Sequence, residues 1–427
     1  MTYEELRTKA REELTQGDAR SAFATFRPAL DYPGLLDSDR RWTDALGLFA
    51  LIAGAMAGEA LEKQIRETTL DDPASLYNLG YELVEQGFHG IAATVLARAD
   101  RLAPGEESVI TEFVAALERA GRHQEACAVL RRDAELLESS LFCSYLLAFN
   151  AMMTGDLDEP RARLPVLRRI ATPDQAWAAE RIGAFLARAD AVRAVSPLDA
   201  GDLRGWHFVL GGSLLLHLSP YGMDAGMAGR YAFLQDSEAT CVEGIRRVEA
   251  VLNAWGAAPP RIFELPDRNS AILAHAASAL LKRPLAPWPS DDPGLIVAYD
   301  LSSLGELDSL REHRPSQILW SHALCWTRDH PVTPDLVTLM HQHNASPWEP
   351  RLVLDSTTKK MTKSEAVKGT SAELGARTAA TPAESLEDLP HLLDLARAVK
   401  PQAAAFRTMG LRERHFESSP VKSSRFA

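Results

Sequence analysis

The sequence predicts two parts of different fold class. Residues 1–195 predict an all-α solenoid of stacked helices, and residues 196–355 predict an α/β domain with a mainly parallel sheet. Apolar and small residues recur at a spacing of 34 in the first part, whereas buried-strand and helical patterns alternate in the second. The polar segment 356–382 predicts a linker, and residues 383–427 predict a C-terminal helix and a flexible tail.

The length and composition are those of a globular protein with more than one core. The chain has 427 residues, of which 46% are hydrophobic and 24% are charged. A net charge of −12 argues against nucleic-acid binding and against a polybasic membrane anchor. There is no apolar run of 18 residues, so we expect no membrane span, and the charged N-terminal helix is unlike a signal peptide. We therefore expect a cytoplasmic protein.

The clearest repeat unit covers residues 73–106, and a second copy follows at 107–140. A shift of 34 residues places Leu76 on Ile110, Leu79 on Phe113, Leu83 on Leu117, Gly87 on Gly121, Ala92 on Ala126 and Leu96 on Leu130. Gly87 and Gly121 fall between two apolar-periodic segments, where a turn favours glycine. The pattern predicts helical hairpins that stack on one another, because a single hairpin cannot bury its apolar stripe.

This pattern resembles the tetratricopeptide repeat. Its characteristic positions are occupied by Leu79, Gly80, Ala92 and Pro104. Leu76 and Leu83 replace the usual aromatic residues, and the second copy has Val114 in place of the first glycine. The resemblance covers roughly residues 1–195, with weaker copies on both sides of the clearest one, and it implies a concave helical surface that binds a protein or peptide partner.

Two polar residues of the first helix in the clearest unit, Asn78 and Glu82, are candidates for contacting such a partner. The alternative is that the helical part only supports the second part of the chain.

The pattern changes after Pro197. Segments 206–218, 261–266, 294–301 and 316–323 predict buried strands, 351–355 predicts an edge strand, and 237–255, 269–282 and 303–312 predict helices. Strands that alternate with helices at this spacing predict βαβ units and a parallel sheet, whose ligands usually bind at the carboxyl ends of the strands.

The turn after the strand 261–266 is one candidate ligand site. Asp267, Arg268, Asn269 and Ser270 precede a helix there. The free N–H groups of that helix, together with Arg268, would suit an anion such as a phosphate. The alternative is an ordinary helix cap with a surface arginine.

Two further candidates follow predicted strands. The segment 218–231 contains three glycines with Asp224 and Arg230, and it predicts either a ligand loop or a flexible loop. Asp300 ends the most clearly buried strand, where it is either a functional acid or the cap of the next helix.

No catalytic motif is present. The sequence has no GxSxG, Walker or GxGxxG pattern, and the four cysteines form no CxxC pair. The late histidines, His322, His330, His341 and His343, lack the regular ligand spacing of a zinc motif, so we expect neither a metal nor a cofactor.

Two functions fit the sequence. The favoured one is a non-enzymatic scaffold or adaptor, whose solenoid binds a protein or peptide while the α/β domain adds a second binding surface. The alternative is that the α/β domain is an enzyme or sensor for a phosphate-bearing or otherwise anionic small ligand, positioned by the solenoid.

Overall fold

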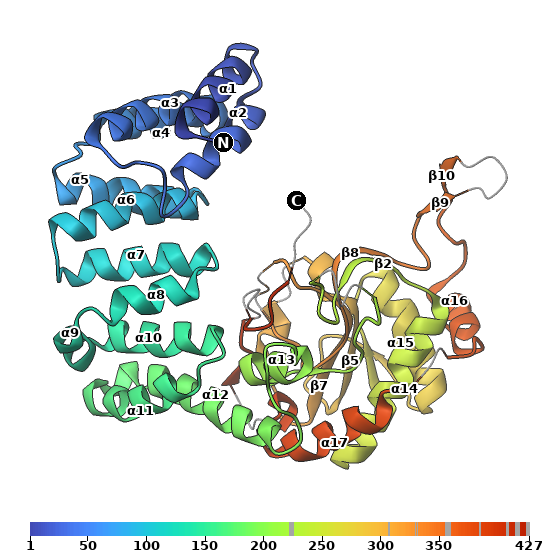
Figure 1. Cartoon of the computed structure of the whole chain (residues 1–427). Coiled ribbons are helices and arrows are strands. Elements are labelled where there is room, and N and C mark those ends of the chain that lie inside the picture. Colours follow the sequence, from blue (N-terminus) through green and yellow to red (C-terminus); the bar gives the residue numbers. More distant parts are fainter. Residues whose placement is uncertain are drawn as a thin grey trace. The chain divides into compact units, whose positions relative to one another are not determined.

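The computed structural model describes residues 1–221, 226–305, 308–328, 330, 332–354, 360–383, 386–406, 410–414 and 419–423. The chain divides into two compact units, Met1–Ile182 and Gly183–Ala427, here called the helical unit and the α/β unit (Figure 1). The predicted fold class is confirmed, because helices are followed by a parallel sheet with its own helices and then by a C-terminal helix.

The helical unit is a series of antiparallel hairpins. Its helices are α1 (Tyr3–Thr15), α2 (Ala19–Leu30), α3 (Asp39–Ala57), α4 (Glu59–Glu67), α5 (Pro73–Glu85), α6 (His89–Leu102), α7 (Glu107–Arg119), α8 (His123–Leu130), α9 (Ala134–Ser139), α10 (Leu141–Met153) and α11 (Asp158–Ile170). Neighbouring helices pack in pairs, for example α5 on α6 and α7 on α8. The next helix, α12 (Trp177–Arg193), contains the boundary between the units.

Glycines make the hairpin turns, as the repeat predicts. Gly17, Gly87, Gly121 and Gly155 have φ angles of 82°, 81°, 70° and 84°. Only glycine adopts this left-handed conformation without strain. At Gly80 the reason for glycine is space, because an added Cβ would lie 2.4 Å from Cγ of Leu96.

One apolar core runs through the helical unit from Tyr3 on α1 to Ala151 on α10. In the N-terminal part of this core, three aromatic rings pack against one another. They belong to Phe23, Phe49 and Phe88, and their centroids lie 5.4 to 6.4 Å apart. The triad connects α2 and α3 with the turn between α5 and α6. The first hairpins therefore share one core with the clearest repeat unit.

The α/β unit is built on a seven-stranded sheet. Its strands are β1 (Leu214–Leu215), β2 (Tyr231–Gln235), β3 (Ile262–Glu264), β4 (Leu285–Pro287), β5 (Gly294–Asp300), β7 (Gln317–Cys325) and β8 (Leu336–Ala345). The order is β1-β8-β7-β5-β3-β4, β2 also pairs with β8, and every pairing is parallel. All residues of β5 and β7 are buried, as expected for central strands of such a sheet.

The helices of this unit are α13 (Leu203–Gly211), α14 (Glu238–Trp255), α15 (Arg268–Leu281), α16 (Ser371–Ala379) and α17 (Leu389–Val399). Two small antiparallel pairs complete it: β9 (Leu352–Leu354) with β10 (Met361–Lys363), and β6 (Glu312–His313) with β11 (Gly410–Leu411). The β9–β10 hairpin extends away from the sheet (Figure 1). None of the described helices combines the length and the apolar character that a bilayer crossing requires.

Several predicted elements need correction. The first part of the expected strand 206–218 belongs to α13, because Asp202 caps the helix by accepting from Gly205 N–H and Gly212 ends it at φ 68°; the strand β1 follows at Leu214–Leu215. The expected helix 303–312 contains two short 3-10 turns and β6, with residues 306–307 outside the described range. The expected edge strand 351–355 corresponds to β9, with residue 355 outside the described range, and among the described strands β9 pairs with β10 rather than with the main sheet.

The segment 356–382, expected to be a linker, contains β10 and α16 among its described residues. Its helix has a capping box in which Thr370 and Glu373 exchange hydrogen bonds. The helix packs closely on α15, because a Cβ added to Gly375 would lie 2.4 Å from Cβ of His275. The segment contains two glycines and few large apolar residues, so its sequence pattern does not indicate a packed helix.

Candidate functional site

Polar residues from four strands lie together at the carboxyl edge of the sheet. Asp236 follows β2, Tyr299 and Asp300 end β5, His322 lies in β7, and His341 belongs to β8. The register pairs Asp300 with Ala323, the residue after His322, and Cys325 with His341, so these polar residues lie within a few positions of one another along neighbouring strands. All five residues are buried.

Asp236 is the centre of this network. Its Oδ2 accepts hydrogen bonds from the Tyr299 hydroxyl at 2.8 Å, from His322 Nε2 at 3.1 Å and from the Cys241 thiol at 3.5 Å. Its Oδ1 accepts from Ser237 N–H at 2.8 Å. Burial acts to raise the pKa of Asp236, but His322 and the hydroxyl and amide donors outweigh it and hold the pKa below its usual range.

The neighbouring donors stay protonated. Burial and the charge of Asp236 raise the pKa of both the Cys241 thiol and the Tyr299 phenol well above their ordinary values. Cys241 also lies 3.8 Å from Nε2 of His322, the same nitrogen that faces Asp236. In a nucleophilic Cys–His–Asp triad, one imidazole nitrogen faces the cysteine and the other faces the aspartate. Here the same nitrogen faces both residues, so the three side chains do not form a catalytic triad.

Asp300 is a second buried acid beside the first. Its Oδ2 lies 3.0 Å from Nε2 of His341 and accepts from Asn344 Nδ2 at 3.2 Å, and its Oδ1 accepts from Ser302 N–H at 2.9 Å. Asn344 Nδ2 also lies 3.4 Å from the Tyr299 hydroxyl, which connects the two acids. Burial acts to raise the pKa of Asp300, but His341 and the two donors lower it to about 2.

This shift predicts an acid-sensitive contribution to folding. Because the pKa of Asp300 is lower in the folded chain than the value of about 3.9 in an unfolded one, its stabilisation is present above pH 4 and is lost between about pH 4 and pH 2. The contribution is roughly 2 kcal/mol. Urea unfolding at a series of pH values should show this loss in the wild type. The slope over that pH range should be smaller in Asp300→Asn, and an equal slope in both would contradict the assignment.

The residues predicted around the α15 N-terminus have separate roles. Asp267 caps α15 by accepting from Ser270 N–H at 2.9 Å. The Ser270 hydroxyl accepts from Tyr299 N–H at 2.8 Å, so Ser270 belongs to the network at the carboxyl edge of the sheet. Arg268 instead donates to the backbone carbonyls of Trp348 and Val367. Asn269 is the second residue of α15, and its buried Oδ1 accepts no hydrogen bond from the described residues.

Arg230 also lies apart from this network. Its guanidinium donates to the carbonyl of Val421 at 3.3 Å and lies 5.3 Å from the Trp326 ring centre, so it holds the described part of the tail. Asp224 is outside the described residues. The sequence therefore predicted Asp300 and Ser270 at the network but missed Asp236, Cys241, Tyr299 and Asn344. Asp236 follows an unpredicted strand, and only the fold brings it to His322.

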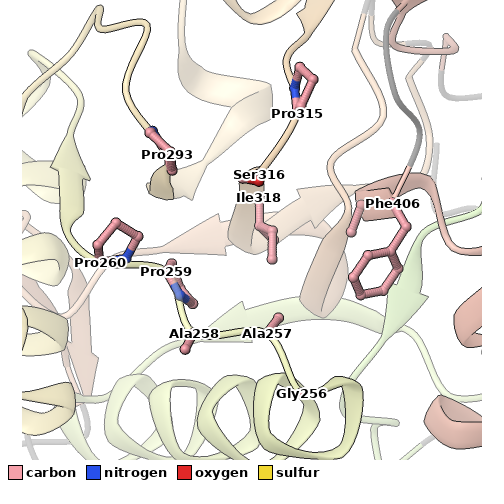
Figure 2. Close-up of a pocket in the computed structure, with 11 residues that line it drawn as sticks. Gly256, Ala257, Ala258, Pro259, Pro260, Pro293, Pro315, Ser316, Ile318 and Phe406 are labelled. Atoms are coloured by element: carbon pink, nitrogen blue, oxygen red, sulfur yellow. The ribbon is translucent and has the colours of Figure 1, made fainter.

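The α/β unit also has a pocket of about 470 Å³ at the opposite, amino-terminal edge of the sheet (Figure 2). Residues 256–260 after α14, Pro293, Pro315, Ser316, Ile318, Ala405 and Phe406 line it. Its described lining contains one polar side chain, Ser316, and no acid or base. It therefore offers shape but no catalytic group.

In the helical unit, the predicted partner-binding residues Asn78 and Glu82 lie on one side of α5. Asn78 is exposed, and its carbonyl accepts from Gln64 of α4 at 3.1 Å. Glu82 is half-buried and accepts from Gln86 at 2.9 Å. The backbone of α5 at Asn78 therefore contacts the preceding helix, while the Glu82 side chain bonds within its own hairpin.

A different strip of side chains crosses the first helices of successive hairpins and reaches α12. We define the α5–α12 strip as Tyr77, Tyr81, Glu85, Glu112, Arg119, Tyr145, Trp177 and Arg181. Burial and the nearby carboxylate of Glu112 raise the pKa of Tyr77, and Glu112 in turn lies in the field of Arg119. Arg181 donates to the Tyr145 hydroxyl, and Trp177 packs edge-on against the Tyr145 ring at 4.9 Å.

The two units thus define a protein with a helical-hairpin array and a parallel α/β domain whose carboxyl edge holds a buried acid–histidine network. Comparisons with known proteins add no family: no protein-family model matches the chain, and no curated protein matches its sequence.

Proposed function

We propose that this protein is an interaction scaffold whose helical unit binds a protein or peptide partner along the α5–α12 strip. The observation that carries the proposal is the exposure of large aromatic rings there. Tyr81 is 48% exposed and Trp177 is 42% exposed, although both residue types are usually more buried. Tyrosine, tryptophan and arginine are the residues that contribute most at protein interfaces.

Neighbouring residues extend this surface. Phe142 on α10 is 51% exposed and lies one helical turn before Tyr145, so the two share a face. Glu85 and Arg119 are exposed beside the rings and supply charges of both signs. Apolar rings surrounded by charges are the arrangement expected of a partner surface with a polar rim.

The α/β unit supplies a second surface in this proposal. The β9–β10 hairpin presents exposed Leu352, Val353 and Met361. An antiparallel pair of this length is marginally stable alone, so its apolar side chains would gain from contact with a partner.

The alternative function, binding of an anionic small ligand by the α/β unit, has less support. The two arginines that would recognise the anion, Arg230 and Arg268, donate to backbone carbonyls instead. What remains at the carboxyl edge is a set of acids, histidines and neutral donors, which does not attract an anion.

Affinity capture with the full chain tests the scaffold proposal. We expect Tyr81→Ala combined with Trp177→Ala to reduce capture of specific partners at least tenfold, because each ring is of the type that contributes more than about 1 kcal/mol to binding. Leu51→Ala is the matched control, since Leu51 is equally exposed but lies on α3. Circular dichroism should be unchanged in both variants. Equal capture by wild type, control and double variant would overturn the proposal.

A further inference from the structure

We propose that Asp236, Cys241 and His322 form a zinc-binding site inside the α/β unit. One carboxylate oxygen, one thiol sulfur and one imidazole nitrogen converge there, and all three residues are fully buried. Asp236 follows β2, Cys241 lies five residues later in the first turn of α14, and His322 lies in the middle of β7, so two neighbouring elements and one that is distant in sequence meet at this point.

The distances between the three atoms match the edges of a tetrahedral zinc site. Zinc bonds of about 2.0 Å to oxygen and nitrogen and about 2.3 Å to sulfur place the O and N ligands about 3.3 Å apart and sulfur about 3.5 Å from each. In the structure Asp236 Oδ2 lies 3.1 Å from His322 Nε2 and 3.5 Å from Cys241 Sγ, and the sulfur lies 3.8 Å from the nitrogen. The three ligand atoms are therefore already spaced as one face of a tetrahedron.

Charge gives an independent reason for a cation at this point. Two other buried acids of the α/β unit have an arginine, since Asp335 pairs with Arg412 and Glu243 pairs with Arg247, whereas Asp300, like Asp236, has a histidine. Within the described part of the chain, no lysine or arginine side chain pairs with the carboxylate of Asp236. Arg351 approaches only its backbone carbonyl. The ion-pair partner of Asp236 is His322, which carries a charge only when it is protonated, so with a neutral imidazole the buried carboxylate has no counterion and a bound divalent cation would supply one.

The ligand types select the metal. A thiolate with an imidazole and one carboxylate suits zinc rather than magnesium or calcium, which prefer all-oxygen shells. Binding would replace the proton of the Cys241 thiol and release it to solvent, while His322 would coordinate as the neutral ring. Aspartate and thiolate together then balance the two charges of the zinc ion. Tyr299 donates to the coordinating oxygen of Asp236 and would orient it from outside the metal shell.

Metal analysis of the purified full chain, followed by cobalt titration of the chelator-treated protein, tests this site. We expect one zinc per chain and, with Co²⁺, the near-ultraviolet charge-transfer band of a thiolate–cobalt bond. Cys241→Ser should remove the band, and Asp236→Asn and His322→Gln should weaken Co²⁺ and Zn²⁺ binding at least tenfold. Cys325→Ser is the matched control, because Cys325 is equally buried but contacts Thr327 and Gln342.

Three results would overturn the proposal: no bound zinc after growth and purification with zinc present, no thiolate band in the wild type, or an unchanged band in Cys241→Ser. A variant that fails to fold is recognised by circular dichroism. In that case the cobalt titration of the folded wild type still decides, because it reports a thiolate bond directly. None of these readouts depends on the partner-binding proposal for the helical unit.

Discussion

Replacing Arg247 by alanine should destabilise the α/β unit by about 3–5 kcal/mol, because it removes one partner of a buried charge network. Arg247 lies on α14 and is buried. Its Nε donates to Glu243 at 2.6 Å, its Nη1 lies 2.5 Å from Asp388, and the same nitrogen donates to the carbonyl of Leu216 at 3.1 Å. Without the guanidinium, Glu243 would remain buried with His217 as its one ionisable partner among the described residues.

The effect should be measured by urea unfolding followed by tryptophan fluorescence, since five fully buried tryptophans lie in the α/β unit. Arg246→Ala is the matched control. Arg246 is the preceding residue on α14, is partly exposed and pairs with Glu249 across one turn, so its loss should change stability by less than about 0.5 kcal/mol. Similar effects for the two variants would show that the network does not stabilise the unit as we describe.

Asp335→Ala should be equally damaging, for a different reason. The carboxylate of Asp335 accepts from Leu319 N–H at 2.7 Å and from Arg412 at 2.6 Å, and both side chains of the ion pair are buried. Arg412 belongs to the C-terminal segment that carries β11, so the pair attaches this segment to β7 and β8. The loss should cost about 3–5 kcal/mol, because the guanidinium is left buried without its acid.

Release of the C-terminal segment provides the second readout for Asp335→Ala. Limited proteolysis should cut the variant near residues 410–414 at protease concentrations that leave the wild type intact. Asp292→Asn is the control, because Asp292 forms an exposed pair with Arg261 on the same unit. Unchanged cleavage and unchanged stability in Asp335→Ala would rule out this attachment.

The sequence predicted the helical unit well because its signals are local. Gly87 and Gly121 mark turns by their backbone requirement, and Leu79 and Leu96 mark the packed faces by their spacing. The same local signals failed at 206–211, where a run of apolar residues forms a buried helix rather than the expected start of a strand. Length and apolar character alone do not distinguish the two.

The candidate site in the α/β unit was only partly predictable, because its residues meet through tertiary contacts. Asp300 was found since it ends a clearly apolar strand. Asp236 was missed because β2 and β8 carry polar residues such as Gln235 and Asn344, which hide their strand character. Cys241 and His322 are 81 positions apart, so no spacing rule for metal ligands could connect them.

The α5–α12 strip shows the same limit in the helical unit. The repeat pattern pointed to polar residues of α5 and gave Asn78, whose backbone carbonyl accepts from Gln64, and Glu82, which accepts from Gln86. The strip instead contains Tyr77 and Tyr81, which lie on the neighbouring side of the helix. It also contains Trp177 of α12, which lies outside the clearest repeat units. The exposure of Tyr81 and Trp177, rather than a sequence pattern, identifies the strip.

Site-specific photocrosslinking tests the proposed function most directly. A photoreactive amino acid would replace Tyr81 in one full-length variant and Leu51 in a second, both of which are exposed positions of the helical unit. We predict that the variant carrying the probe at position 81 forms defined crosslinked products with a partner, and that the variant carrying it at position 51 does not. Equal product patterns from both positions, or no product from position 81 under conditions in which the partner is captured, would contradict the proposal that the strip is the binding surface.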